Sequence, residues 1–334
     1  MAEKTPLCFT RLLGHERAGE MLKRSLVTDR IPHSFIFKGP EGVGRKLFGR
    51  GFAAAINCRD SSTIGACGIC SSCLKFYSGN HPDFMVVSSE KGGIRINQVR
   101  NLSRNLSYPP YESAMRVVIL EDVHTMRQEA ANSLLKTLEE PPENNLLILT
   151  ADASREILAT LTSRCQVVPF CRLSNDDTAR ILKGHGVSSA EALLLAHLSE
   201  GSPGRALLLK ETDIVELWKD IVAVLSSGQS GADADIGVLI KLAAKMAELQ
   251  ENLEHLLGLL KVWFRDLLVA ARVPACSKET ILQFSGVDLE LSPLKSWSSG
   301  QLFAKVQAID SAQRALARNC NKLLVCEVLL FKLQ

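Results

Sequence analysis

A glycine-rich stretch near the N-terminus has the composition of a phosphate-binding loop. It covers residues 39–46, follows the apolar run Phe35–Phe37 and precedes a helical pattern. Glycines allow backbone N–H groups to surround a phosphate at a helix N-terminus, where the helix dipole also favours negative charge. The spacing approximates G-x-x-x-x-G-K-[ST] and makes these residues candidates for a nucleotide site: Gly39, Gly42, Gly44, Arg45 and Lys46. An ordinary glycine-rich turn between a strand and a helix is the alternative.

Two positions of this loop depart from the phosphate-loop pattern. Arg45 stands where the pattern has lysine, and Lys46 stands where it has Ser or Thr. The forked guanidinium of arginine is bulkier than an ammonium group, although it keeps the charge. The lysine at the second position removes the hydroxyl that ligates Mg²⁺, and hydrolysis needs that metal. We therefore expect a phosphate-loop scaffold without hydrolysis, and the sequence leaves open whether Arg45 still holds ATP.

Two carboxylates follow a second apolar run. The run is Val117–Leu120, and Glu121 and Asp122 come directly after it. In phosphate-loop ATPases, an Asp at such a strand end holds Mg²⁺ and a Glu activates water, but the order of the two residues is reversed here. The alternative is that both carboxylates stabilise the positive end of the next helix. In either case the motif indicates the end of a central strand.

Four of the ten cysteines are close together in the sequence. They follow the spacing C-x8-C-x2-C-x2-C and are Cys58, Cys67, Cys70 and Cys73. Four thiolates at such spacing complete a closed tetrahedral zinc shell that leaves no position for water, so we expect a structural zinc ion. Chance clustering, a redox pair and an iron–sulfur cluster are the alternatives. Nearby His81 is not needed as a ligand.

The composition is that of an ordinary globular chain. The chain has 334 residues, of which 46% are hydrophobic and 22% charged, so a disordered chain is excluded. A net charge of +3 excludes a protein that coats DNA by bulk charge, and 5% aromatic residues disfavour stacking platforms for single strands. The N-terminal segment is charged and no apolar run is long enough to span a membrane, so we expect a cytoplasmic protein.

Short apolar runs alternate with helical patterns over residues 1–172. Five runs are strand candidates: Phe35–Phe37, Phe84–Val87, Val117–Leu120, Leu146–Thr150 and Gln166–Phe170. A helical pattern covers Gln128–Leu138. Continuous apolar strands separated by helices predict a mostly parallel sheet with helices on both faces. The class is therefore an α/β domain into which the cysteine module at 58–73 is inserted.

The character of the sequence changes at about residue 173. Ser174 is a good N-cap for a helix, and strand signals end there. Beyond residue 211 apolar residues recur at spacings of three and four, as from Leu249 to Leu267, which predicts helices. The polar segment Ser226–Asp235 is predicted to be a loop. We expect a small helical domain at 173–210 and an all-helical domain at 211–334.

Several segments together resemble bacterial clamp-loader subunits of the AAA+ superfamily. The resemblance extends over most of residues 8–210 and, more weakly, to the C-terminus. The segments are Leu13–His15, Arg30–Ser34, Ala130–Pro142, Ser163–Cys165, Gly201–Ala206 and Ala317–Asn321. The resemblance implies an AAA+ domain with a phosphate-loop sheet, a helical lid domain and a helical collar through which subunits associate in a ring.

The resemblance also implies roles for single residues. The Ser-Arg-Cys triplet makes Arg164 an arginine finger that acts on ATP held by a neighbouring subunit; a surface salt bridge is the alternative. Thr150 falls in the sensor-1 region, or is an ordinary strand-terminal hydroxyl. In hydrolysing relatives the helical-domain sensor is an Arg that follows Gly-Ser-x. That position is Gly204 here, and Arg205 comes one residue later, so this sensor is shifted or lost.

The phosphate loop, the strand-end carboxylates and the helical-domain sensor all depart from the pattern of hydrolysing relatives, whereas Arg164 is intact. This combination favours a stator-like subunit that does not hydrolyse its own ATP but assists a neighbour. The implied partners are the motor subunits and the delta subunit of the same loader, and, through the complex, the sliding clamp and primed DNA. The expected cofactor is structural zinc, and ATP binding by this chain is doubtful. An active motor subunit of the same loader and a zinc-dependent DNA-binding protein are the alternatives. We find no polymerase or nuclease site in the sequence.

Overall fold

The structure is a computed structural model, described for residues 8–60, 62, 64–90, 93–227, 236–272 and 297–334. The chain divides into two compact units. The first comprises Met1–Gly186 and Gly201–Gly204, and the second comprises Val187–Glu200 and Arg205–Gln334. The division into domains 1–172, 173–210 and 211–334 stays a prediction. Among the described residues, no helix has the length and apolar character needed to cross a membrane.

A parallel sheet of five strands forms the centre of the first unit, in the order β2-β3-β4-β1-β5. Its strands are β1 (Ser34–Lys38), β2 (Phe84–Val87), β3 (Arg116–Leu120), β4 (Asn145–Ala151) and β5 (Gln166–Pro169). Each coincides with an apolar run of the sequence, so the predicted strands and their parallel pairing are confirmed. β3 and β4 are buried along their whole length, as expected for strands covered on both faces.

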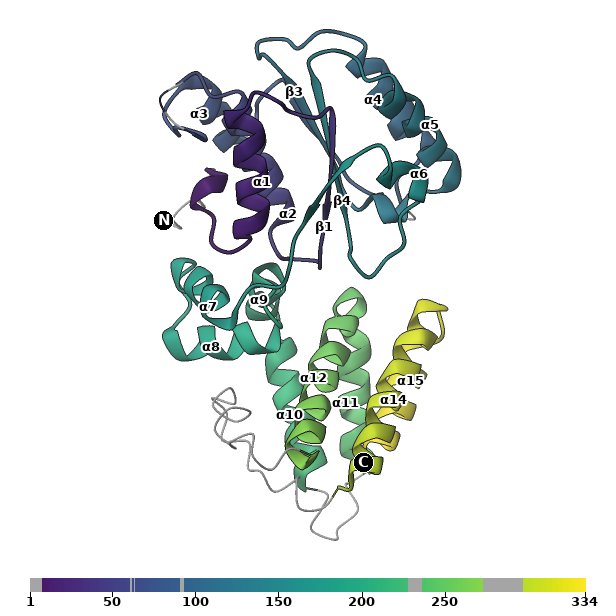
Figure 1. The fold of residues 1–334 in the computed structure, drawn as a ribbon. Helices are drawn as coiled ribbons and strands as arrows, with labels where there is room; N and C mark the ends of the chain where they lie inside the picture. Colours follow the sequence, from purple (N-terminus) through teal and green to yellow (C-terminus); the bar gives the residue numbers. More distant parts are fainter. Residues whose placement is uncertain (1–7, 61, 63, 91–92, 228–235, 273–296) are drawn as a thin grey trace. The chain divides into compact units, whose positions relative to one another are not determined.

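Helices cover both faces of this sheet, as predicted. α1 (Glu16–Val27) and α2 (Arg45–Ile56) lie on one face, and α4 (Ile96–Leu106) and α5 (Gln128–Glu139) lie on the other (Figure 1). Successive residues of a strand point to opposite faces. Accordingly, Phe35 and Phe37 of β1 pack in the core beneath α1 and α2, and Ile36 between them packs in the core beneath α4 and α5.

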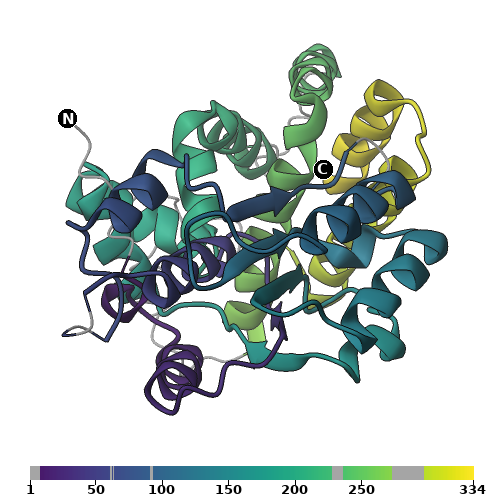
Figure 2. The same cartoon turned by 90° about the horizontal axis from the view of Figure 1, so that it is seen from above.

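The remaining elements of the first unit are short. They are η1 (Phe9–Arg11), α3 (Ser71–Ser78), η2 (Val123–Thr125), α6 (Ala159–Thr162) and α7 (Asn175–Gly184). The predicted N-cap is confirmed, because Ser174 Oγ accepts a hydrogen bond of 3.0 Å from the N–H of Asp177. Seen from above, α4 and α5 again lie on the side of the sheet away from α1 (Figure 2).

Every described element of the second unit is helical, as predicted. These are α8 (Ser189–Leu198), α9 (Pro203–Glu211), α10 (Ile214–Ser227), α11 (Ile236–Glu248), η4 (Gln250–Asn252), α12 (Leu253–Arg272), α14 (Ser299–Ala317) and α15 (Lys322–Leu333). α12 lies against α14, and α11 against α15. Ser226 and Ser227 belong to α10, so the loop prediction is wrong at these two residues; the rest of the predicted loop, 228–235, lies outside the described residues.

Lys305 is a buried cation in the second unit. Its Nζ lies 4.5 Å from the centre of the Trp297 ring and donates a hydrogen bond to the carbonyl of Leu333. That carbonyl belongs to the last turn of α15, where backbone carbonyls have no partner within the helix. Burial in this apolar setting lowers the pKa of Lys305 to about 8.

A lowered lysine pKa makes the stability of the second unit depend on pH. From the lowered pKa of about 8 up to the usual 10.5, the unfolded chain holds more protons at this residue than the folded one. The free energy of unfolding should therefore rise by about 2–3 kcal/mol across this window. Lys305→Met should remove that rise, whereas Lys332→Met, at an exposed position of α15, should keep it.

Chemical denaturation followed by tryptophan fluorescence measures this effect, because Trp218, Trp263 and Trp297 all belong to the second unit. The quantity to compare is the difference in unfolding free energy between each variant and the wild type at the two ends of the window. An equal pH dependence in Lys305→Met and in the wild type would show that the lysine is not desolvated.

Candidate functional site

The glycine-rich stretch forms a loop between β1 and α2. Gly39 donates its N–H to the carbonyl of Ala151 at 3.1 Å, and a Cβ at this position would lie 2.5 Å from the carbonyl oxygen of Phe170. Gly42 and Gly44 have φ of 73° and 102°, a region that favours glycine. α2 begins directly after Gly44, so the loop has the strand–loop–helix context of a phosphate-binding loop.

Arg45 is turned into the protein at the start of α2. It is 6% exposed, and its Nη2 lies 3.6 Å from Asp122 Oδ1. Burial lowers the pKa of Arg45, and the carboxylates of Asp122, Asp152 and Glu41 oppose this shift. Its Nη1 is buried without a hydrogen-bond partner among the described residues. The guanidinium is therefore directed at the end of β3.

Lys46 forms the second ion pair at this edge. Its Nζ lies 2.8 Å from Glu121 Oε2, and the lysine is 56% exposed while the glutamate is only 14% exposed. The structure thus brings together the two cations of α2 and the two carboxylates after β3. Asp122 precedes η2, but its side chain makes no capping hydrogen bond there. Both carboxylates are paired with cations of the chain itself.

Thr150 lies at the same edge of the sheet. Its Oγ1 accepts a hydrogen bond of 3.0 Å from the N–H of Asp122, and the residue is fully buried. The hydroxyl therefore fixes the backbone of Asp122, which has the uncommon φ of 54°. A neighbouring carboxylate, that of Asp152, has a lowered pKa: burial opposes this, but hydrogen bonds from Ser154 outweigh it.

Arg205 belongs to the second unit, where it pairs with Glu200. Its Nη1 is 3.9 Å from Glu200 Oε2, and the same glutamate binds Arg265 through a pair of 2.5 Å. Carboxylates beside Arg265 raise its pKa, although burial opposes the shift. The structure therefore places Arg205 in an ion-pair network of the helical unit.

Arg164 follows α6 and leads into β5. Its Nη2 lies 2.6 Å from Glu139 Oε1 at the end of α5, and the arginine side chain is 35% exposed. Its carbonyl accepts a hydrogen bond of 3.0 Å from Ser34 Oγ at the start of β1. The phosphate loop follows the other end of β1, so the strand separates Arg164 from the loop of its own chain. The guanidinium is partly exposed, and its Nη1 also donates hydrogen bonds to the carbonyl of Thr160 and to Ser163 Oγ.

The four clustered cysteines converge on one point. Their sulfurs all lie within 4.8 Å of one another. Cys73 Sγ is 3.8 Å from Cys58 Sγ and 3.9 Å from Cys67 Sγ. Four sulfurs held tetrahedrally at about 2.3 Å from one zinc ion lie about 3.8 Å apart. The cluster therefore fits a single tetrahedral metal ion.

Backbone donors surround these sulfurs. Cys67 donates its N–H to Cys58 Sγ at 3.3 Å, Cys70 to Cys67 Sγ at 3.4 Å, and Cys73 to Cys70 Sγ at 3.4 Å. Burial would raise the pKa of Cys70, but these and neighbouring hydrogen bonds lower it to about 6, whereas burial raises the pKa of Cys73. His81 lies apart from the cluster, with its Nε2 3.3 Å from Ser72 Oγ.

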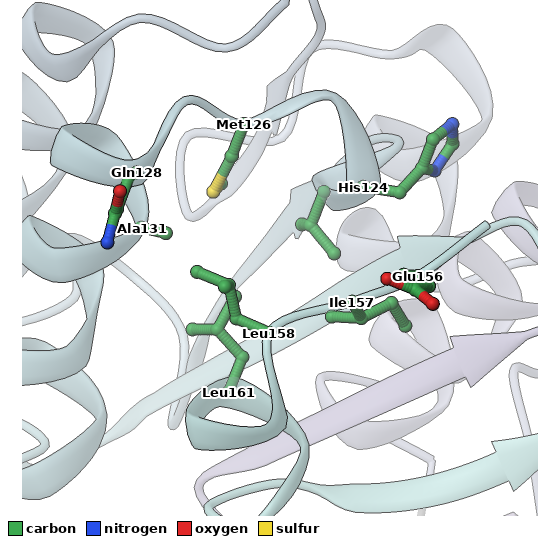
Figure 3. A pocket seen from close by; sticks show the side chains of 9 residues that line it. His124, Met126, Gln128, Ala131, Glu156, Ile157, Leu158 and Leu161 are labelled. Carbon is green, nitrogen blue, oxygen red and sulfur yellow. The ribbon is translucent and has the colours of Figure 1, made fainter.

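A pocket of about 360 Å³ lies between η2, the start of α5 and the segment before and within α6. Leu158 and Leu161 face Met126 and Ala131 across it, and His124 and Glu156 add polar groups (Figure 3). Nothing in the sequence indicated this pocket, because its lining comes from three separate segments. The sequence analysis also missed two carboxylates beside the predicted arginines: Glu139 pairs with Arg164, and Asp152 lies near Arg45.

Comparison with known proteins gives related sequences. Residues 14–174 match the family model "DNA polymerase III, delta subunit". DNA polymerase III subunit delta' of Pseudomonas aeruginosa is 33% identical over 196 residues, which is 57% of this chain and 59% of that protein. DNA polymerase III subunit tau of Escherichia coli is 30% identical over 215 residues, which is 63% of this chain and 33% of that protein. The chain thus spans between a third and three fifths of these relatives.

Two solved structures superpose more loosely. A DNA polymerase III gamma subunit-related protein of Thermotoga maritima has a TM-score of 0.47 and 19% identity, covering 94% of this chain and 97% of the other. The RuvB Holliday junction branch migration motor of the same organism has a TM-score of 0.43 and 14% identity, covering 87% of each chain. These related sequences confirm the resemblance drawn from the motifs. The chain is about equally similar to delta' and to tau.

The cysteine cluster should carry one zinc ion per chain. Cys70→Ser should lower both the metal content and the melting temperature, because a structural zinc site contributes folding energy. Cys171→Ser, an exposed cysteine outside the cluster, should change neither. Elemental analysis of the purified chain and thermal unfolding measure the two effects. A wild-type chain purified without any metal would contradict the prediction.

Proposed function

We propose that the chain is a delta-prime-type clamp-loader subunit that does not hydrolyse ATP itself. The match of residues 14–174 to the DNA polymerase III delta subunit family and the 33% identity to delta' of Pseudomonas aeruginosa support this proposal. The observation that carries this proposal is the pairing of both carboxylates with cations of α2. Lys46 forms an ion pair with Glu121, and Arg45 forms one with Asp122. A hydrolytic site needs such carboxylates for Mg²⁺ and for the attacking water. Here both are engaged within the chain.

Residues at three positions also support a chain that does not hydrolyse ATP. Lys46 has no hydroxyl to ligate Mg²⁺, and its ammonium group would repel the ion. Thr150, which the resemblance places in the sensor-1 region, holds the N–H of Asp122. Arg205 binds Glu200 within the helical unit, and the position that carries a sensor arginine in hydrolysing relatives is Gly204.

We infer that Arg164 acts as an arginine finger on ATP of a neighbouring subunit. Its guanidinium lies at the surface and is held by a partly exposed pair with Glu139. Such a pair contributes about 0–1 kcal/mol, so exchanging Glu139 for a phosphate costs little. The carbonyl of Arg164 accepts a hydrogen bond from Ser34, and its Nη1 donates to the carbonyl of Thr160 at 3.1 Å and to Ser163 Oγ at 3.3 Å, so these contacts near the surface hold the side chain in place. An arginine finger stabilises the negative charge that develops on the γ-phosphate during transfer.

The proposed partners are the motor subunits and the delta subunit of a cytoplasmic clamp loader. The sliding clamp and primed DNA would be engaged through the complex. Zinc in the cysteine cluster would be structural, because four thiolates leave no coordination position for a substrate. A motor subunit of the same loader is the second candidate, since tau of Escherichia coli matches as well as delta' does. Stoichiometric ATP hydrolysis by the purified chain, lost in Arg45→Ala, would favour that candidate.

Arg164→Ala should leave folding and assembly intact and slow ATP-dependent clamp loading by the reconstituted complex at least tenfold. Arginine fingers contribute about 10³–10⁵ in related phosphoryl transfers, and other ATPase sites of the ring retain their own arginines. Arg24→Ala, an exposed arginine of α1, is the matched control. The measurement is steady-state ATP hydrolysis and clamp loading on primed DNA.

Unchanged rates with Arg164→Ala in a complex of normal composition would rule out the finger. Size-exclusion chromatography of the variant complex separates this outcome from a failure to assemble. Glu139→Gln provides a further check, because releasing Arg164 from its surface pair should not reduce the rate.

A further inference from the structure

Three consecutive carbonyls of the phosphate loop accept hydrogen bonds from groups outside the loop. Ser202 Oγ donates to the carbonyl of Glu41 at 2.9 Å. Gly204 donates its N–H to the carbonyl of Gly42 at 2.8 Å. His15 Nε2 lies 2.9 Å from the carbonyl of Val43. All these residues belong to the first unit.

The donors come from two segments that are themselves fixed. The carbonyl of Gly201 accepts a hydrogen bond of 2.9 Å from the N–H of Leu173, and Ser202 is 4% exposed. The ring of His15 packs against Phe170 and Phe48, with centroids 4.8 Å and 5.4 Å away. The loop is therefore tied to parts of the core rather than to surface side chains.

The position of Gly204 depends on its lacking a side chain. A Cβ there would lie 2.9 Å from the Cα of Gly42 and 3.0 Å from its carbonyl oxygen. Any other residue at 204 would have to push the loop away. Gly204 is also the second residue of α9, so its N–H has no partner within the helix and is satisfied by the loop.

We propose that Ser202, Gly204 and His15 form a three-point clasp that holds the phosphate loop in one conformation without nucleotide. Directly after the loop, Arg45 and Lys46 form ion pairs with Asp122 and Glu121, which further fix the start of α2. The loop of this chain is then a fixed structural joint. The inference rests on the non-hydrolysing role proposed above, but its test does not use the complex.

Amide hydrogen exchange of the full chain tests the clasp at the N–H of Gly204. This amide should be protected at least tenfold in the absence of nucleotide, and adding Mg²⁺ and ATP should leave its exchange rate unchanged. Ser202→Ala removes one donor and should speed exchange about fivefold, the usual contribution of one hydrogen bond. Ser311→Ala, a serine of α14 with a local hydrogen bond, should have no effect.

A second variant uses a different readout. Gly204→Ala should lower the melting temperature by several degrees because of the collision with Gly42, whereas Gly19→Ala, which has open space around its Cβ position, should not. Rapid exchange of Gly204 in the wild type, or protection that arises only with Mg²⁺ and ATP, would falsify the clasp. Failure of the arginine-finger role would show in the Arg164→Ala complex and would leave these exchange rates as expected.

Discussion

Strand β1 is paired on both sides, and this pairing positions the phosphate loop, Thr150 and Arg164. It pairs in parallel with β4 on one side and β5 on the other, and four of its five residues are buried. Since the carboxyl ends of parallel strands meet at one edge, the loop after β1, the carboxylates after β3 and Thr150 of β4 converge there. Arg164 precedes β5 and lies at the opposite edge. One sheet therefore separates the loop from the arginine by the length of a strand.

Charge balance explains why the departures in the loop occur together. A cation in place of Ser or Thr would be unpaired if no carboxylate lay beside it. Two carboxylates with neither a metal ion nor a cation beside them would be unpaired as well. Partly buried charges without partners destabilise a fold. Here Lys46 meets Glu121 and Arg45 meets Asp122. Lys46 thus adds one positive charge beside Glu121, whereas Arg45 keeps the charge of the lysine in the pattern and pairs with Asp122.

Much of the fold could be predicted from the sequence, since it depends on local patterns. The apolar runs predicted the strands because a strand buried on both faces needs continuous apolar residues, and only the ends differ by one or two positions, as for Ser34–Lys38. The cysteine spacing predicted a convergent cluster because residues so close in sequence meet within one loop and the start of a helix. The loop prediction was wrong at Ser226 and Ser227, because both serines belong to the last turn of helix α10.

By itself, the sequence determined the class of the sheet, the place of the glycine-rich loop, the cysteine cluster and the identity of the candidate charges. Only the tertiary structure decided which charges pair, that Thr150 holds Asp122, and that Arg164 faces away from its own loop. It also decided the contact of Ser202 with Glu41, which joins residues 161 positions apart. The physical reason is that periodicity and short spacing act within one element, whereas hydrogen bonds and ion pairs at a sheet edge depend on which strands lie side by side.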